Sequence, residues 1–97
     1  MRESEYQRKI YTKLEKLFPG CMIIKNDPQS LQGIPDFLIL WKGYWAALEV
    51  KTSPKAEIQP NQEIYVDNMN SMSFAAFIYP ENEEEVLCDL QHAFGCS

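Results

Sequence analysis

The spacing of apolar residues along the chain predicts three helices and four strands. Apolar residues recur every three or four positions in the helical segments, which are 2–18, 59–72 and the stretch after Asn82. Apolar runs bounded by Gly, Pro or polar residues mark the strands, which are 21–25, 35–41, 44–51 and 74–79. The elements follow one another in the order αβββαβα, which is typical of an α/β fold.

The two central strands form a hairpin around Lys42-Gly43, where glycine supplies the positive φ of a tight turn. A symmetric turn pairs Trp41 with Tyr44 and, counted outward, Asp36 with Glu49. Both strands are apolar on both faces, and a sheet of this kind needs helices on both sides. We therefore predict a mixed four-stranded sheet, flanked by helices on both faces, in a single domain over residues 1–97.

The pairing of the hairpin brings two acids together. Asp36 and Glu49 lie on one face with their Cβ atoms about 4.5–5.5 Å apart, and Lys51 points to the same face. Facing carboxylates repel each other, and a divalent cation between them would relieve the repulsion. Mg²⁺ suits this position because it takes one or two carboxylates and completes its shell with waters and phosphate oxygens. The alternative is that both acids are exposed strand ends and that Lys51 is a local salt-bridge partner.

The same residues resemble a known nuclease signature. Pro35-Asp36, a spacer and Glu49-Val50-Lys51 match the PD-(D/E)xK pattern. Gly33-Ile34-Pro35-Asp36 together with Leu48-Glu49-Val50-Lys51 is most similar to the small VRR-NUC-type branch and to Holliday junction resolvases. The resemblance covers most of the chain, from the first helix to the strand at 74–79. It implies a restriction-endonuclease-like core in which Asp36, Glu49 and the Val50 carbonyl bind Mg²⁺, with Mn²⁺ as a substitute, while Lys51 orients or deprotonates the attacking water.

The resemblance also implies an acid on the first helix that completes the site. Glu3, with apolar Tyr6 and Ile10 three and seven residues further on, fits the family pattern better than Glu5. The alternative is that both acids simply favour a helix N-terminus, and whether Glu3 or Glu5 completes the site also stays open. Ser4-x-x-Gln7 predicts a capping box that starts the helix at Ser4 and leaves Glu3 just outside it.

Polar residues on two further segments belong to the predicted site. The family carries a glutamine on the helix after E-x-K, and Gln62 matches that position; its alternative interpretation is a boundary residue that interrupts an apolar stripe. The polar loop that enters the Asp36 strand should lie beside the site. Its candidate substrate-binding residues are Gln29, Ser30 and Gln32.

The net charge of −5 argues against nucleic-acid binding at first sight, because phosphate contacts need cations. The distribution of charge weakens this objection. All nine Lys and Arg lie in residues 1–55, opposed there by six acids, whereas residues 56–97 hold eight acids. A bound cation would offset the acids of the site further, so a DNA-binding surface in the first half of the chain stays open.

The remaining composition excludes several other chemistries. One histidine, His92, and three cysteines without metal-ligand spacing offer neither a zinc cluster nor a Ser-His-Asp triad. No apolar run approaches the roughly 20 residues that span a bilayer, so no membrane partner is expected. The cysteines are interpreted as reduced thiols of a cytoplasmic protein, or of one in the host cytoplasm if the chain is viral.

These features predict a metal-dependent DNA endonuclease that hydrolyses phosphodiester bonds, and the resemblance implies a preference for branched or four-way junction DNA. The resemblance further implies a homodimer. Large apolar residues near the hairpin turn, Trp41, Tyr44 and Trp45, would suit an interface. The alternative is a catalytically inactive DNA-binding or assembly module that keeps the same fold.

Overall fold

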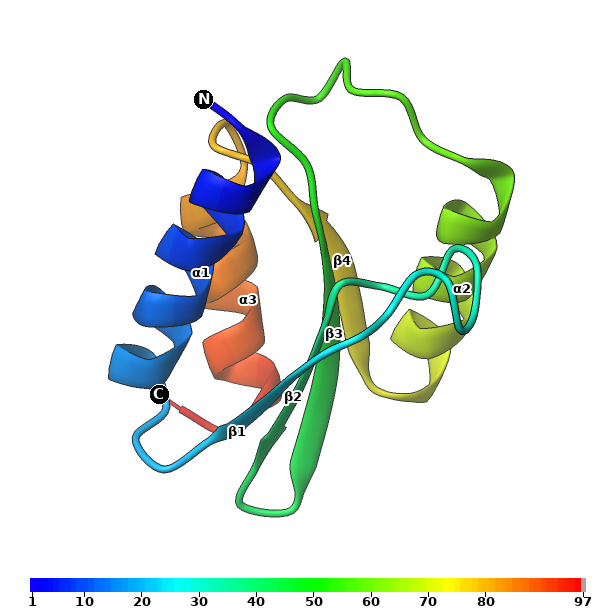
Figure 1. The fold of residues 1–97 in the computed structure, drawn as a ribbon. Coiled ribbons are helices and arrows are strands. Elements are labelled where there is room, and N and C mark those ends of the chain that lie inside the picture. Colours follow the sequence, from blue (N-terminus) through cyan, green and yellow to red (C-terminus); the bar gives the residue numbers. More distant parts are fainter. Residues whose placement is uncertain (97) are drawn as a thin grey trace.

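The computed structural model describes residues 1–96 and contains the predicted elements in the predicted order. The helices are α1 (Glu3–Leu17), α2 (Pro60–Met72) and α3 (Glu83–Ala93). The strands are β1 (Met22–Lys25), β2 (Phe37–Trp41), β3 (Tyr44–Val50) and β4 (Phe74–Ile78). The first three strands form an antiparallel meander and β4 pairs with β3 in parallel, so the sheet is mixed. Helices α1 and α3 lie on one face and α2 on the other, which confirms the predicted α/β class (Figure 1).

The hairpin that joins β2 to β3 has the predicted turn and register. Lys42 and Gly43 have φ angles of 51° and 84°, the left-handed pair that a two-residue type I′ turn requires. Trp41 pairs with Tyr44, and the pairing continues outward to Phe37 and Leu48. The next positions outward are those of Asp36 and Glu49, so the turn sets the two acids side by side.

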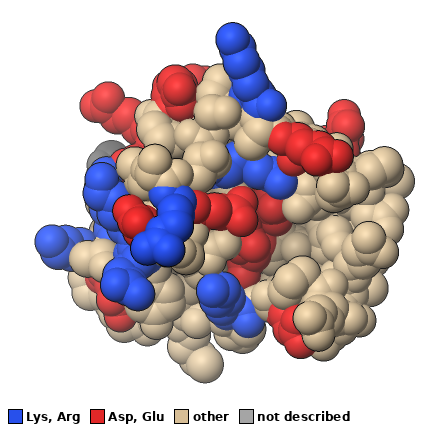
Figure 2. All heavy atoms as spheres, turned by 45° about the horizontal axis from the view of Figure 1, so that its top comes forward, with Lys and Arg blue, Asp and Glu red and all other residues tan. Residues whose placement is uncertain are grey.

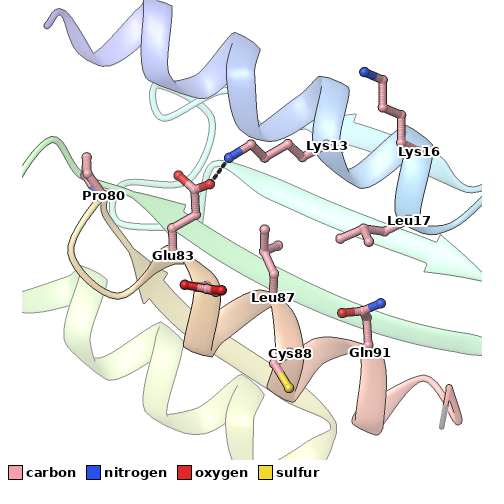
Figure 3. A pocket seen from close by; sticks show the side chains of 9 residues that line it. Lys13, Lys16, Leu17, Pro80, Glu83, Leu87, Cys88 and Gln91 are labelled. Carbon is pink, nitrogen blue, oxygen red and sulfur yellow. Dashed lines mark hydrogen bonds and ion pairs between the residues drawn. The ribbon is translucent and has the colours of Figure 1, made fainter.

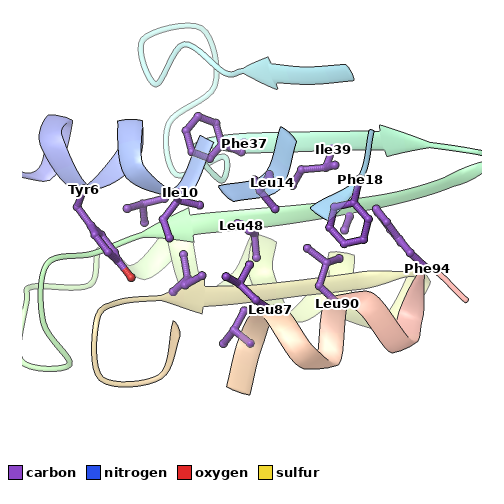
Figure 4. Packing of buried hydrophobic residues seen from close by; sticks show 14 residues of the cluster. Tyr6, Ile10, Leu14, Phe18, Phe37, Ile39, Leu48, Leu87, Leu90 and Phe94 are labelled. Carbon is purple, nitrogen blue, oxygen red and sulfur yellow. The ribbon is translucent and has the colours of Figure 1, made fainter. Parts of the chain in front are cut away.

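The main core lies between the sheet and the pair α1 and α3. Large side chains from the sheet and from the two helices interdigitate there (Figure 4), and burying each of them fully contributes about 1.5–3 kcal/mol. The principal residues are Tyr6, Ile10, Leu14 and Phe18 of α1, Phe37, Ile39 and Leu48 of the sheet, and Leu87, Leu90 and Phe94 beside them. The apolar residues that recur every three or four positions in the first and last helices therefore form their inward faces.

The opposite face of the sheet is covered only in part. Ala47, Val66 and Ala75 form a small second cluster beneath α2, which packs on β3 and β4. On β1 and β2 the same face stays open, because Met22 is 62% exposed and Leu38 and Leu40 are only half-buried. Asp36 and Glu49 belong to this face, so they lie beside a sheet surface that the fold leaves accessible.

One local prediction is wrong. Helix α1 begins at Glu3 with Arg2 as its N-cap and no side-chain cap, so the capping box predicted at Ser4 does not form. Trp41 packs its ring on Phe18 and Phe94, against the core, and donates its Nε1–H to the Pro19 carbonyl at 2.9 Å, while its place in an interface stays a prediction. Across residues 1–96 no helix is long and apolar enough to cross a membrane.

Candidate active site

The predicted acids lie at the end of the sheet where β2 begins and β3 ends, at the top of Figure 1. Asp36 immediately precedes β2, and Glu49 is the last residue but one of β3. The Asp36 carboxylate accepts a hydrogen bond at Oδ2 from the Val50 N–H, 2.8 Å away. This bond ties the start of one strand to the end of the other and holds Asp36 against the Glu49-Val50 peptide.

Glu49 is a buried carboxylate with one oxygen unsatisfied. Only 3% of the residue is exposed, and its Oε2 accepts a hydrogen bond from Gln62 Nε2 at 2.8 Å. Its Oε1 is buried and finds no hydrogen-bond partner among residues 1–96. A buried polar atom without a partner lowers stability by about 1–3 kcal/mol, and by more if it is charged. A cation or a hydrogen-bond donor placed beside this oxygen would therefore be stabilising.

Lys51 is also buried, and its ammonium is fixed by three oxygens. Its Nζ donates to Gln62 Oε1 at 2.9 Å and to the Glu57 carbonyl at 3.1 Å, and it lies 3.6 Å from Glu49 Oε2. The ammonium therefore faces the acids from the α2 side. The salt bridge considered as an alternative for Lys51 is present, within a larger hydrogen-bonded cluster.

Gln62 connects the two charged residues and does so from the first turn of α2. Its Nε2 binds Glu49, while its Oε1 accepts from Lys51 and from the Gln59 N–H at 3.0 Å. The bond to Gln59 starts the helix, with Pro60 at its first position. Gln62 thus caps its own helix and orients the site, so its place in an otherwise apolar stripe has a structural reason.

The glycine of the G-x-P-D motif allows the loop before Asp36 to touch α2. Gly33 has a φ of +91°, and a Cβ added there would lie 2.4 Å from Asn61 Cβ and 3.0 Å from the Gln62 nitrogen. Only a residue without a side chain permits this approach in this backbone conformation. The contact fixes the start of α2 against the Asp36 loop and so places Gln62 over Glu49.

The buried acids have altered proton affinities. Burial and then the negative charge of Asp36 raise the pKa of Glu49 to about 7, although Lys51 opposes the shift. Burial likewise raises the pKa of Asp36, while the bond from Val50 and the charge of Lys51 act against it. Near neutral pH the pair therefore shares a proton part of the time, and a cation bound between the acids would displace it.

The structure separates the two acids proposed for α1. Burial and then the charge of Asp36 raise the pKa of Glu3, so Glu3 lies within the electric field of the site. Glu5 instead pairs with Arg2 at 3.1 Å on the exposed side of the helix. Glu3 is the α1 acid that borders the site, although its side chain is exposed and makes no hydrogen bond to the cluster among residues 1–96.

The loop residues proposed for substrate binding are not joined to the acids. Gln29, Ser30 and Gln32 are all exposed. The Gln29 N–H and the Ser30 hydroxyl bond to Asp27 at 2.9 and 3.4 Å, which makes a local turn. Their role in binding substrate stays a prediction.

The two carboxylates suit an open site for a hard divalent cation, in which waters and substrate oxygens complete the coordination. No group of three His, Cys, Asp or Glu side chains within residues 1–96 is arranged to hold a metal ion by itself. Mg²⁺, however, is commonly bound by one or two carboxylates with waters and substrate oxygens in the other positions. The unpartnered Glu49 Oε1, the Asp36 carboxylate and the neighbouring Val50 carbonyl are oxygen donors of the kind that Mg²⁺ and Mn²⁺ take.

Two residues on the α1 side of the sheet had no predicted role in the site. Gln7 lies on the buried stripe of α1, three residues before Ile10, and a polar residue at such a position is the signal that would have identified it. Lys25 is the last residue of β1. Burial raises the pKa values of Asp36 and Glu3, and the positive charge of Lys25 opposes both shifts, so Lys25 interacts with both acids. Figure 2 shows acids gathered in a hollow at the centre of this end of the molecule, with many Lys and Arg side chains on the α1 side.

A larger cavity lies elsewhere and does not involve these residues. It occupies about 800 Å³ between α1 and α3, on the other face of the sheet (Figure 3). Glu83 at its rim is paired with Lys13 and accepts a hydrogen bond from the Tyr6 hydroxyl at 2.8 Å. Burial opposes the ionised form, but these two partners lower the pKa of Glu83, so its charge is already satisfied within the fold.

A comparison of the chain with protein-family models, with curated proteins and with solved structures finds no match. A function is therefore inferred from the residues of this chain and from the resemblance of its motif.

Proposed function

We propose that this protein is a Mg²⁺-dependent nuclease of the PD-(D/E)xK type that hydrolyses phosphodiester bonds in DNA, with Mn²⁺ able to replace Mg²⁺. The observation that carries the proposal is the unpartnered, buried Oε1 of Glu49 beside a second carboxylate and a buried lysine. A fold keeps such an arrangement at a cost in stability, which a functional role explains.

Each residue of the cluster has a role that its contacts support. Asp36, Glu49 and the Val50 carbonyl would hold the cation, which when bound supplies a water of lowered pKa and neutralises charge on the phosphate. Lys51 presents its ammonium to the same space, where it orients the attacking water and stabilises negative charge developing on the phosphate. Gln62 fixes the Lys51 and Glu49 side chains relative to each other through its two hydrogen bonds. Glu3 adds a further acid at the border.

The charge distribution supports a polyanionic substrate in spite of the net charge. Lys and Arg side chains on the α1 side stand beside the acidic hollow (Figure 2), although one cation of α1, Lys13, is paired with Glu83 of α3. Phosphates on both sides of a cleaved bond would meet these cations, and affinity should fall as the salt concentration rises.

A nuclease that resolves a symmetric four-way junction needs two sites in a fixed relation, and a homodimer supplies them. We place the second copy on the open face of β1 and β2. Register aligns Met22 with Leu40 and Ile24 with Leu38 there, in one apolar strip next to the site. Light scattering at micromolar concentration should give twice 11.3 kDa, and Met22→Lys should halve that mass. Met72→Lys, at an exposed methionine on α2, is the control, and a single-chain mass for the unmodified protein would exclude the dimer.

The competing function is a catalytically inactive DNA-binding or assembly module. The Lys51–Glu49 ion pair is the observation in its favour, because it partly satisfies the acid without a cation. Cleavage separates the two functions, since only the enzyme turns over substrate.

The decisive test is cleavage of a panel of duplex, flap and four-way-junction DNAs with Mg²⁺ or Mn²⁺. We expect cleavage of at least one branched substrate, and its loss in Asp36→Ala. Asp67→Ala changes an exposed aspartate on α2 and should cleave like the unmodified protein. Equal cleavage by Asp36→Ala would exclude the site, and metal-independent binding of DNA without any cleavage would favour the inactive module.

A further inference from the structure

A second pocket opens beside Ser4 and Gln7, between α1 and the edge strand β1. It has a volume of about 270 Å³, and its lining residues are Ser4, Gln7, Arg8, Tyr11, Lys25 and Phe37. It lies on the α1 side of the sheet, whereas Gln62 and Lys51 approach the acids from the α2 side. The volume is just under the roughly 300 Å³ at which small-molecule sites begin, which suits one nucleotide unit and excludes a duplex.

Gln7 gives the pocket a polar side chain. The residue is only 9% exposed. Glu49 Oε1 is the only fully buried side-chain N or O atom of residues 1–96 that lacks a hydrogen-bond partner, so the Gln7 amide, which makes no hydrogen bond there, is accessible to solvent. Since Gln7 lines the pocket, the space that its amide faces is the pocket itself. A carboxamide carries a donor and an acceptor side by side, which is the pattern that pairs with the edge of an unpaired base.

Tyr11 gives the pocket an aromatic wall. Its ring meets Phe37 edge to face, with centroids 6.1 Å apart and planes at 66°, so the orientation of the ring is set by the core. Tyr11 remains 38% exposed. Stacking of a base on such a ring contributes about 1–3 kcal/mol and is independent of sequence.

Arg8 and Lys25 give the pocket its charge, and they come from two different elements. Lys25 lines the pocket and pairs across the two strands with Phe37, the residue that follows Asp36. Arg8 stands one helical turn after Ser4, on the pocket side of α1. A phosphate that joins the two sites would meet both cations.

We propose that this pocket binds a single unpaired nucleotide of DNA that flanks the phosphate being cleaved. The base stacks on Tyr11 and pairs through its edge with Gln7, and the linking phosphate lies on Lys25 and Arg8. The proposal rests on the proposed nuclease function and gives it a substrate class. A fully paired duplex cannot fill the pocket, whereas a flap or branch point, where a base is free, can.

The test measures binding in EDTA, so that it does not depend on cleavage. The probes are two fluorescent DNAs of equal length, a fully paired duplex and a duplex with one unpaired nucleotide. We expect tighter binding of the second, and a loss of about 5- to 100-fold of that affinity in Tyr11→Leu, with less than a twofold change for the paired duplex. Gln7→Leu, which replaces the amide with an apolar side chain of similar size, should reduce the same preference.

Tyr44→Leu is the matched control. Tyr44 is 45% exposed and stacks on Phe94 near the hairpin turn, far from the acids along β3, so the change should leave the preference intact. Thermal unfolding of each variant checks that it is folded.

The outcomes separate this proposal from the nuclease proposal. An undiminished preference in folded Tyr11→Leu and Gln7→Leu, or no preference in the unmodified protein, would overturn the pocket whether or not the protein cleaves DNA. A preference that Tyr11→Leu removes in a protein without cleavage would keep the pocket and reject the nuclease. Absence of binding to either DNA would overturn the pocket as well.

Discussion

The two faces of the sheet are built on opposite principles. Toward α1 and α3 the sheet carries large apolar side chains that are almost wholly buried, with Tyr6 and Phe18 among the largest. Toward α2 the buried apolar cluster consists of two alanines and a valine, and the neighbouring positions at the strand ends hold Asp36, Glu49 and Lys51. One face supplies stability and the other tolerates groups that lower it.

This division has an energetic consequence. Burying charged groups that are incompletely paired costs free energy, and a small domain has little stability in excess. The thick core on one face offsets that cost on the other. Because the acids stand at strand ends, the strands still pair normally along their length. The unfavourable contacts are confined to one end of the sheet.

The largest effect expected from this difference is on stability. Leu90→Ala removes a wholly buried side chain of the α1–α3 face and should lower the free energy of unfolding by about 2–5 kcal/mol. Met69→Ala on the α2 face removes a half-buried side chain of similar size. It should cost about 1 kcal/mol, because this side chain buries less apolar surface on folding than Leu90 does. Urea denaturation of both variants measures the difference, and equal losses would mean that the two faces contribute alike.

The second effect is a pH dependence of the free energy of unfolding that arises from the acids at the end of the sheet. The pKa of Glu49 is raised from its usual 4.5 to about 7, so between these values the folded protein retains a proton that the unfolded chain releases. Stability must therefore fall as pH rises through this window, by about 2–3 kcal/mol in metal-free buffer. Glu49→Gln has no proton to lose and should show a flatter profile.

The measurement is the difference in unfolding free energy between the unmodified protein and Glu49→Gln, from pH 4.5 to 7.5 in EDTA. Burial also raises the pKa values of Asp36 and Glu3, and because Asp36 and Glu49 interact, the difference between the two profiles reports the titration of the pair. Glu63→Gln, at an exposed acid on α2, is the control and should follow the unmodified protein. Parallel profiles for the unmodified protein and Glu49→Gln would show that burial of Glu49 carries no such penalty.

Much of the fold and the pairing of the acids could be predicted, because both depend on local rules. A two-residue turn at Lys42-Gly43 sets the register, and the register alone sets Asp36 beside Glu49. The period of apolar residues likewise identifies the helix faces that form the core.

What could not be predicted depends on tertiary distances. The same period that identifies core faces cannot tell that Gln7 lines a pocket, because the pocket forms only where α1 meets β1 and β2. The start of α1 was mispredicted because Ser4 offers a cap that the chain does not use. The hydrogen bonds of Gln62 to Lys51 and Glu49 join segments whose approach no local pattern describes.

The smallest effect tests the contact between the Gly33 loop, which leads to Asp36, and the start of α2, which carries Gln62. Gly33 and Gly20 both have positive φ, at +91° and +84°, but a Cβ at Gly20 would meet nothing within 4 Å, whereas one at Gly33 would collide with Asn61. Gly20→Ala therefore measures backbone strain alone, about 1 kcal/mol, and Gly33→Ala adds displacement of the α2 start, which we expect to cost about 1–2 kcal/mol more. Because that displacement moves Gln62 away from Glu49 and Lys51, Gly33→Ala should also reduce cleavage at saturating Mg²⁺ while Gly20→Ala does not. Urea denaturation and cleavage assays on the two variants measure both effects, and equal stability with equal cleavage would show that the contact between the Gly33 loop and α2 does not position the site.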